Sequence, residues 1–293
     1  MIRCDDPFVG FFADYEHALK MGEYAPELLR AFREVVWDYY KIHKRPFVWR
    51  ETFDPYRIVV SEIMLQQTQT HRVVEKYLNF IVHFPTFQAL ASASSHAVLA
   101  QWVGLGYNRR ALALYGIAQR IVHEYGGILP DDPLVLQTFK GLGPATASSI
   151  VAFAFNKPTV FIETNIRSVY LHVFFADQSG VADKLLVPLV EQTVDQDRAR
   201  EWYYALMDCG VLLKKLYGNP NKKSRHYSQQ SSFKGSNRQV RGFIIRHLTR
   251  HKGLERNKLN ELFPNKINEL PSIIEGLIKD GFIIERDDIV EPV

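Results

Sequence analysis

The sequence predicts a mainly α-helical protein of 293 residues. Apolar residues recur every three or four positions over most of the first 215 residues, and no alternating apolar run precedes residue 280. Gly and Pro separate the periodic segments. The length suggests about two domains at roughly 150 residues each. With 46% hydrophobic residues the chain can form a sizeable core, which excludes wholesale disorder.

The periodic segments give the expected helices in chain order. Residues 1–24 are expected to be irregular, with aromatic side chains that pack on a neighbouring element. Pro46 and Pro85 each end a helical pattern. The helices are expected at 24–43, at two segments within 56–84, and at 90–105, 110–125, 134–139, 144–155, 163–175, 183–194 and 198–216.

The composition changes after residue 215. Residues 216–236 are rich in Gly, Asn, Pro, Lys and Ser and predict a linker. Three short helical patterns and a hairpin follow, which together resemble a winged helix; the helices are expected at 240–248, 259–263 and 267–278, and the hairpin turn at 286–288. This segment is either a DNA-binding module or, because its last 35 residues carry 8 acids and 3 bases, a module for protein interaction or dimerisation.

Basic residues are concentrated in one stretch of the chain. Thirteen of the 36 Lys+Arg lie between Lys214 and Lys258, with Glu255 as the single acid there. That stretch carries a net charge of +12, and the other 23 basic and 31 acidic residues give −8. Such a stretch either follows a polyanion such as nucleic acid or is a solvated linker.

Cysteine content and apolar run length restrict the class of protein. Cys4 and Cys209 cannot supply four thiolates, so an iron–sulfur or all-cysteine zinc site within one chain is excluded. The apolar runs are shorter than the roughly 20 residues that span a membrane, and we expect neither a secretory signal nor a membrane partner. We expect an intracellular protein, in the cytoplasm or nucleoid if the source is prokaryotic.

Residues 136–155 carry a helix-hairpin-helix pattern. Gly141 and Gly143 flank one apolar residue and permit a tight turn between helices. Lys140, Thr146 and the backbone N–H groups at the start of the second helix can then meet a DNA phosphate. The alternative is an ordinary pair of helices.

Four further motifs carry a family resemblance over about residues 45–215. They are Trp49-Arg50, Ser61-Glu-Ile-Met-Leu-Gln-Gln-Thr68, Gly104-Leu-Gly-Tyr107 and Phe161-Ile-Glu-Thr-Asn-Ile-Arg167. Their order and spacing resemble the helix-hairpin-helix DNA glycosylases that share the endonuclease III fold, and the second motif most resembles the A/G-specific adenine glycosylases. The resemblance implies a two-lobed helix-hairpin-helix glycosylase fold plus a small C-terminal winged-helix-like domain. The implied parts are an N-terminal extension (1–24), a discontinuous helical domain (25–51 plus 156–215), a six-helix domain (52–155), a basic linker (216–236) and the winged-helix-like domain (237–293).

Two carboxylates suit the cleavage of an N-glycosidic bond. The reaction develops positive charge on the sugar and negative charge on the leaving base, so a proton donor and a second, ionised carboxylate answer both needs. The resemblance assigns the acid to Glu62, the stabilising carboxylate to Glu163 and its support to Asn165. The family has Asp at the second position, so either the pocket is reshaped for Glu163, or the step is slow, or the protein is catalytically weak.

The resemblance also assigns residues of the base pocket. Bifunctional relatives, which also cut the DNA backbone, carry a lysine where this chain has Ala145. Alanine offers no nucleophile, so we expect no β-lyase activity by that route. Arg50 would pair with acidic or phosphate groups near the pocket or form a structural salt bridge.

The target base must leave the duplex before it is cut, and something must fill the gap. By resemblance Gln67 and Tyr107 are the wedge residues, with Leu65 beside them. Gln66 and Thr68 would contact the partner strand. The alternative for Tyr107 is a loop aromatic packed on the core.

Two departures concern cofactors and the C-terminal domain. Relatives place an iron–sulfur cluster on four cysteines, where this chain has Lys214, Asn221, Ser224 and Gln230, so we expect no cluster and no other cofactor. A monovalent cation at the hairpin would rest on the main-chain carbonyls of Gln137, Phe139 and Leu142. The usual domain that reads 8-oxoguanine is replaced from residue 237 onward.

The sequence therefore predicts a monofunctional DNA glycosylase of base excision repair. Its partner would be double-stranded DNA with a mismatched or damaged base, and its target adenine mispaired with guanine or 8-oxoguanine. One alternative is a glycosylase for mismatched thymine, uracil or a modified pyrimidine. The other is a non-catalytic DNA-binding or damage-sensing protein. The sequence indicates no particular protein partner.

Overall fold

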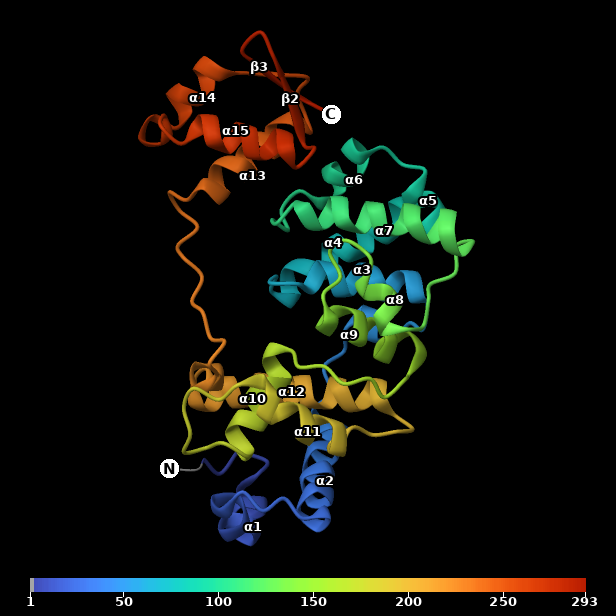
Figure 1. The fold of residues 1–293 in the computed structure, drawn as a ribbon, viewed down its shortest axis with the longest axis vertical. Helices are drawn as coiled ribbons and strands as arrows, with labels where there is room; N and C mark the ends of the chain where they lie inside the picture. The colour runs from blue at the N-terminus through green and yellow to red at the C-terminus, as the bar shows by residue number, and fades with distance from the viewer. Residues whose placement is uncertain (1–2) are drawn as a thin grey trace. The chain divides into compact units, whose positions relative to one another are not determined.

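The computed structural model describes residues 3–293 and is mainly helical (Figure 1). The chain divides into two compact units. The first comprises the residues up to Ile58, Asp131–Thr138 and Leu142–Gln229; the second comprises Val59–Pro130, Phe139–Gly141 and Gln230–Val293. Over the described part of the chain, no helix is long and apolar enough to cross a membrane.

The first unit is built from helices. Its elements are α1 (Val9–Met21), α2 (Pro26–His43), the 3-10 helix η1 (Val48–Arg50), α8 (Pro133–Gln137), α9 (Pro144–Phe155), α10 (Thr164–Val173), α11 (Asp183–Thr193), α12 (Ala199–Tyr217) and the 3-10 helix η2 (Pro220–Lys223). Helix α3 (Pro55–Leu65) begins in the first unit and ends in the second.

Aromatic side chains form the core of the first unit. Phe32 of α2 is fully buried, and its ring lies 5.5 Å from that of Tyr170 in α10 and 6.1 Å from that of Trp202 in α12. Phe8, just before α1, stacks on Phe32 at 5.8 Å. Burial of rings of this size is a large apolar contribution to stability. This core fixes α10 and α12 side by side, and these two helices carry part of the candidate site.

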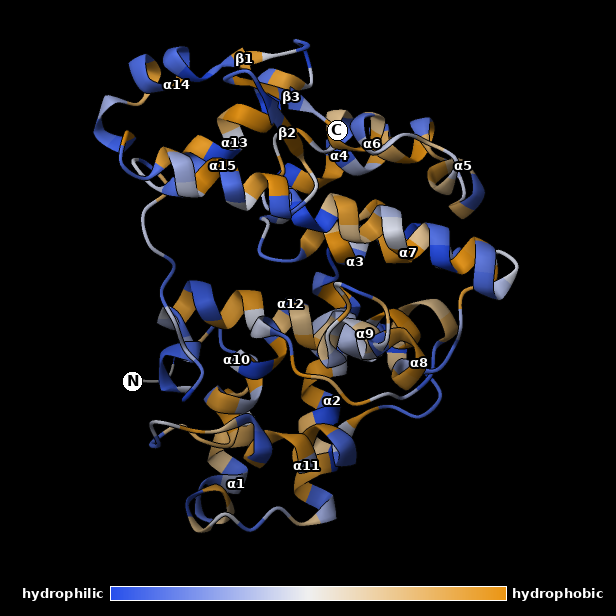
Figure 2. Ribbon diagram, turned by 45° about the horizontal axis from the view of Figure 1, so that its top comes forward, coloured by the Kyte–Doolittle hydropathy of each residue, from blue (hydrophilic) through white to orange (hydrophobic). Residues whose placement is uncertain are grey.

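The second unit begins with the end of α3. Its other elements are α4 (Thr70–His83), α5 (Phe87–Ala91), α6 (Ser95–Trp102), α7 (Arg109–Tyr125), α13 (Asn237–Leu248), β1 (Leu254–Glu255), α14 (Arg256–Leu262), the 3-10 helix η3 (Pro264–Lys266), α15 (Leu270–Lys279), β2 (Ile283–Arg286) and β3 (Ile289–Pro292). Along α7 and α15, hydrophobic and hydrophilic residues occur together, as in amphipathic helices (Figure 2). In α7 the buried positions Ala111, Leu114, Ile117, Ala118 and Ile121 follow the spacing of three and four that predicted the helix.

The three strands form one antiparallel sheet in the order β1-β3-β2. Asp287 and Asp288 turn the chain between β2 and β3, and their φ values of 47° and 60° are those of a tight hairpin turn. The predicted three helices and hairpin are therefore present, together with the short strand β1, which the sequence did not indicate. The winged-helix assignment stays a prediction.

Three expectations were wrong in detail. The N-terminal segment contains helix α1, where an irregular segment was expected; residues 1 and 2 lie outside the described part. Residues 90–105 were expected as one helix but contain the end of α5 and the whole of α6, separated at residues 92–94, because Ser94 caps α6 by accepting a hydrogen bond from Ala97 N. The linker starts later than residue 216, since α12 continues to Tyr217 and η2 buries Asn221.

Candidate functional site

Glu62 projects from helix α3, within the second unit. Asp54 stabilises the start of this helix, because its carboxylate accepts a hydrogen bond from Tyr56 N at 2.9 Å. Ser61 and Ile63 are buried on either side of Glu62, whereas Glu62 itself is half-buried. A half-buried carboxyl on a rigid helix can be both held in place and reached by a ligand.

The guanidinium of Arg110 organises the chain that follows α3. Its Nη1 donates hydrogen bonds to the carbonyl oxygens of Ile63, Met64 and Gln66 at 2.9, 2.9 and 2.6 Å. Its Nη2 donates to Thr68 Oγ1 at 2.9 Å and to the carbonyl oxygen of Gly106 at 3.1 Å. One side chain of α7 thus caps the end of α3 and joins its following loop to the loop before α7.

Arg110 remains a cation at neutral pH. Burial lowers its pKa to about 10, which still leaves it protonated. Its Cζ also lies 5.4 Å from the centroid of the Trp102 ring and 5.5 Å from that of Tyr107. Arg110 was not predicted as a site residue, because its five acceptors lie on segments that only the fold brings together.

Both predicted wedge residues have left-handed backbone conformations. Gln67 has φ 52° and Tyr107 has φ 50°, values that are uncommon outside glycine and costly unless the surroundings enforce them. Arg110 supplies that enforcement, because it holds the residues next to both. Gln67 is exposed, Leu65 is half-buried and Tyr107 is 37% exposed.

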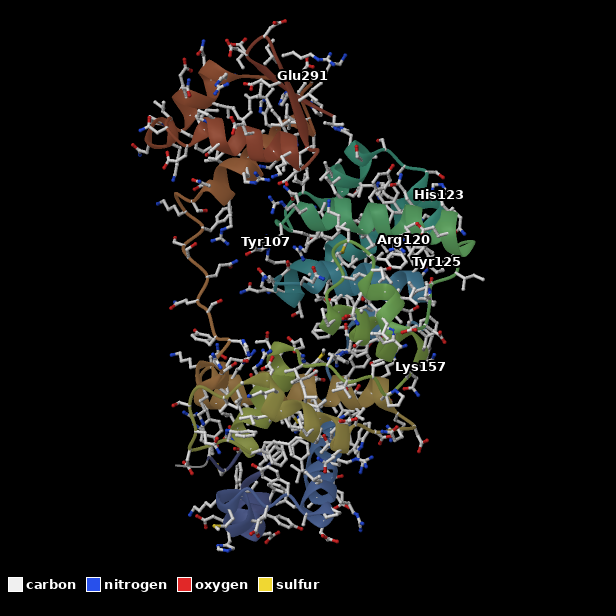
Figure 3. The ribbon with its side chains drawn as sticks, viewed as in Figure 1. Tyr107, Arg120, His123, Tyr125, Lys157 and Glu291 are labelled. Carbon is white, nitrogen blue, oxygen red and sulfur yellow. The ribbon has the colours of Figure 1, made fainter. Side chains whose placement is uncertain are left out.

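Tyr107 lies near one end of α7, and Arg120, His123 and Tyr125 lie towards the other (Figure 3). The hydroxyl of Tyr107 accepts a hydrogen bond from Arg238 Nη1 at 3.1 Å. The ring is therefore not packed wholly into the core, and the wedge role of Tyr107 stays a prediction.

Glu163 and Asn165 form the second cluster, at the start of α10 in the first unit. Glu163 is the N-cap residue: its Oε2 accepts a hydrogen bond from Asn165 N at 2.6 Å. Its Oε1 accepts a second from Asn165 Nδ2 at 3.1 Å. The longer side chain of Glu is thus folded back over the helix N-terminus, where the macrodipole favours a negative charge.

Helix α12 packs against α10 (Figure 1). Lys214 Nζ donates a hydrogen bond to Asn165 Oδ1 at 2.8 Å. One turn earlier, Gly210 lies so close to the backbone of Asn165 that a Cβ there would be 2.2 Å from its carbonyl oxygen. The resemblance marked Lys214 only as a replaced cysteine, so this contact was not expected.

Arg50 forms a structural ion pair in the first unit. Its Nη1 and Nη2 donate to Asp208 Oδ2 and Oδ1, both at 2.8 Å, and the Asp208 side chain is almost fully buried. Arg45 Nε donates to the same carboxylate at 2.6 Å. Of the two expectations for Arg50, the structural salt bridge is present, and the pocket role stays a prediction.

The hairpin between α8 and α9 has the expected tight turn. Gly141 has φ 99°, and Gly143 is the N-cap of α9, followed by Pro144 at the first helical position. Lys140 and Ala145 are exposed and Thr146 is half-buried, so the first turn of α9 can be reached by a phosphate. The cation site at Gln137, Phe139 and Leu142 stays a prediction.

Comparison with known proteins relates this arrangement to one superfamily. The family model "HhH-GPD superfamily base excision DNA repair protein" matches residues 60–189. The human adenine DNA glycosylase is 35% identical over 195 residues, which are 62% of this chain and 36% of that protein. The Mycobacterium tuberculosis adenine DNA glycosylase is 38% identical over 181 residues, 60% of this chain and 59% of that protein. This chain therefore spans less than two thirds of both relatives.

A relative with a different activity is covered more fully. The thymine/uracil-DNA glycosylase of Methanothermobacter thermautotrophicus is 25% identical over 187 residues, 63% of this chain and 85% of that protein. Among solved structures, a thermostable thymine-DNA glycosylase matches with a TM-score of 0.56 at 24% identity, over 67% of this chain and 88% of that one. A non-covalent endonuclease III–DNA complex matches with a TM-score of 0.53 at 14% identity, over 72% and 91%. The fold is therefore endonuclease III-like.

Proposed function

We propose that this chain, whose residues 60–189 match the model of the helix-hairpin-helix superfamily of base excision DNA repair proteins, is a monofunctional DNA glycosylase. Its substrate is double-stranded DNA, from which it removes adenine mispaired with guanine or 8-oxoguanine. The observation that carries the proposal is the fixed carboxylate of Glu163, whose two oxygens accept hydrogen bonds from Asn165. The adenine glycosylase relatives support the choice of base.

The two carboxyl groups divide the chemistry. Glu62 protonates a ring nitrogen of adenine, which makes the base a better leaving group, and then helps to activate water. The carboxylate of Glu163 stabilises the positive charge that develops on the sugar. A carboxylate already oriented by its neighbours needs little reorganisation when that charge appears, which is the basis of its contribution to rate.

The DNA contacts follow from the same assignment. Gln67, Tyr107 and Leu65 fill the gap left by the flipped base, and Gln66 and Thr68 meet the partner strand. The hairpin binds phosphate through backbone N–H groups, with Lys140, Gly141, Gly143 and Thr146 at the contact. Two strained residues held by one half-buried arginine, Arg110, support the wedge assignment, since strain of this kind concentrates at functional sites.

The reaction ends at base release. Ala145 has a methyl group where bifunctional relatives have a lysine, so no Schiff base forms there. The product is an intact strand with an abasic site, which breaks only in hot alkali. Borohydride should therefore trap no covalent complex between protein and DNA.

The test is incubation with a duplex that contains one adenine opposite 8-oxoguanine, followed by hot alkali. Strand breaks should appear with the wild type and with Glu75→Gln, an exposed control on α4, but not with Glu62→Gln. No break above the Glu62→Gln level would reject adenine excision. DNA binding without release of any base from a substrate panel would instead identify a non-catalytic damage sensor.

A second candidate is excision of mismatched thymine or uracil. It is favoured by the thymine/uracil-DNA glycosylase relative, of which the chain covers 85%, and by the small side chain of Ala145. Duplexes with thymine or uracil opposite guanine separate the two candidates. Release of free base only from the adenine duplex eliminates this one.

A further inference from the structure

Four positions of this chain stand where the resemblance expects cluster cysteines, and the groups that two of them, Lys214 and Asn221, present do not fit an iron–sulfur cluster. Lys214 donates its ammonium hydrogen to Asn165 Oδ1. Asn221 donates its amide hydrogens towards α10. Iron in such clusters needs thiolate electron pairs, whereas these atoms present hydrogens. The region must therefore be stabilised in a different way.

Asn221 attaches the segment after α12 to the first turns of α10. Its Nδ2 donates to the carbonyl oxygen of Thr164 at 2.9 Å and lies 2.6 Å from Ser168 Oγ. Asn221 is 4% exposed, and a buried amide hydrogen bond of this kind is costly to break. Thr164 and Ser168 lie on the same helix as Asn165, so this contact fixes the helix that carries the Glu163 cluster.

Lys214 adds a directional contact to the same helix. An ammonium group can only donate hydrogen bonds, so it requires the oxygen of the Asn165 amide to face α12. The Nδ2 of that amide then faces Glu163 Oε1, to which it donates at 3.1 Å. A reversed amide would place an NH2 group against an ammonium and an oxygen against a carboxylate. Lys214 therefore selects the Asn165 rotamer that orients Glu163.

Burial of Lys214 supports a structural role for its charge. Burial lowers the pKa of Lys214 and the Glu163 carboxylate raises it, with Arg167 lowering it further. Lys215, the next residue of α12, is exposed and has no such partner among the contacts described. The neighbouring pair thus provides a matched comparison between an oriented lysine and a solvated one.

We propose that Lys214 is a positioning residue for Glu163, acting through the side-chain amide of Asn165, and that Lys214 and Asn221 together replace the cluster in fixing the start of α10. The positioning role rests on the proposed glycosylase function. The contact itself does not, so the two can fail separately.

The first test measures single-turnover base excision at saturating enzyme, together with the Kd for a duplex that contains a non-cleavable abasic analogue. Lys214→Met should lower the rate between about 10- and 100-fold, because a carboxylate misplaced by about 1 Å costs about 100-fold. Lys215→Met should leave the rate unchanged. Lys214→Arg, which keeps a charged donor, should recover a large part of the loss.

A double-mutant cycle shows whether Lys214 acts through Asn165. Asn165→Ala should lower the rate, and Lys214→Met added to it should lower the rate no further. Independent losses that multiply would overturn the proposal. So would a loss confined to Kd, which would make Lys214 a phosphate contact.

The second test does not depend on activity. In 15N-labelled protein, the side-chain amide signals of Asn165, identified by their absence in Asn165→Ala, should shift and exchange faster with solvent in Lys214→Met but not in Lys215→Met. Unchanged signals would reject the contact whether or not the protein excises a base. If the signals respond as expected but the wild type releases no base, the contact holds and the proposed function fails.

Discussion

Gly210 and Asn165 meet where helices α12 and α10 cross, and only a residue without a side chain fits there. A Cβ on Gly210 would lie 2.2 Å from the carbonyl oxygen of Asn165 and 2.9 Å from its Cα. Both distances are far inside van der Waals contact with backbone atoms, which cannot rotate away. The spacing between the two helices, and with it the place of Glu163, therefore depends on one glycine.

Gly210→Ala is expected to shift the start of α10 and to disturb the Glu163 cluster. Overpacking of this kind costs about 1–3 kcal/mol of unfolding free energy, measured by urea denaturation, and the excision rate should fall at least about tenfold. Gly116→Ala is the control, because that helical glycine has nothing within 4 Å of its Cβ position. Equal stability of the two variants would show that the helices can separate freely.

Arg110→Lys is expected to disorganise both wedge loops although the charge is kept. A lysine ammonium has three donors at one point, whereas the guanidinium reaches five oxygens at the end of α3 and on two loops. Unfolding free energy should fall by about 2–4 kcal/mol. The rate of base extrusion, followed with 2-aminopurine next to the lesion, should fall more than the rate of the chemical step.

Arg109→Lys is the matched control for this prediction. Its guanidinium pairs with Asp280 at 2.7 Å, but its side chain is 73% exposed, and exposed pairs contribute little. The variant should fold and extrude the base like the wild type. Similar losses at positions 109 and 110 would contradict a specific role for Arg110.

The N-terminal segment should give the protein an acid-sensitive contribution to stability. Burial by itself raises the pKa of Asp6, but hydrogen bonds from His172, Phe8 N and Tyr217 outweigh it and lower the pKa. A carboxyl whose pKa is lowered by folding contributes stability above its unfolded pKa, about 3.9, and loses it as pH falls through the folded pKa. Asp6→Asn should therefore cost about 1–3 kcal/mol at pH 7, and the difference from wild type should shrink as the pH falls below the unfolded pKa of about 3.9. A difference independent of pH would contradict this account.

Much of the helical fold could be predicted because the signal is local. The spacing of Leu114, Ile117 and Ile121 gave α7, and Pro144 after Gly143 gave the start of α9. Residues 9–21 were missed because α1 has few buried positions of its own and depends on Phe8 and Phe11 packing against Phe32. A helix that is stabilised mainly by contacts with other segments shows only a weak apolar periodicity in its own sequence.

In the candidate site, the sequence indicates contacts between residues close along the chain but not contacts between residues far apart along it. The resemblance placed Glu163 and Asn165 two positions apart, so their contact needs only local geometry. Lys214 lies 49 positions from Asn165, and Arg110 lies 42 from Thr68, so neither partner is visible without the fold. The left-handed backbone conformations of Gln67 and Tyr107 could not be predicted either, because tertiary contacts and not the residue types enforce them.

Substitution at Glu163 separates its capping role from its role in the reaction. Gln keeps an oxygen that can accept from Asn165 N, so Glu163→Gln should change unfolding free energy by only about 1 kcal/mol, yet lower the excision rate by about 100-fold or more because the charge is lost. Asp is a better N-cap than Glu, so Glu163→Asp should be at least as stable as wild type. It should nevertheless be slower, since Asn165 and Lys214 are arranged around the longer side chain. Glu191→Gln on the exposed face of α11 is the control for both. A faster Glu163→Asp variant would show that the site is built for the shorter acid and that Glu163 limits the rate.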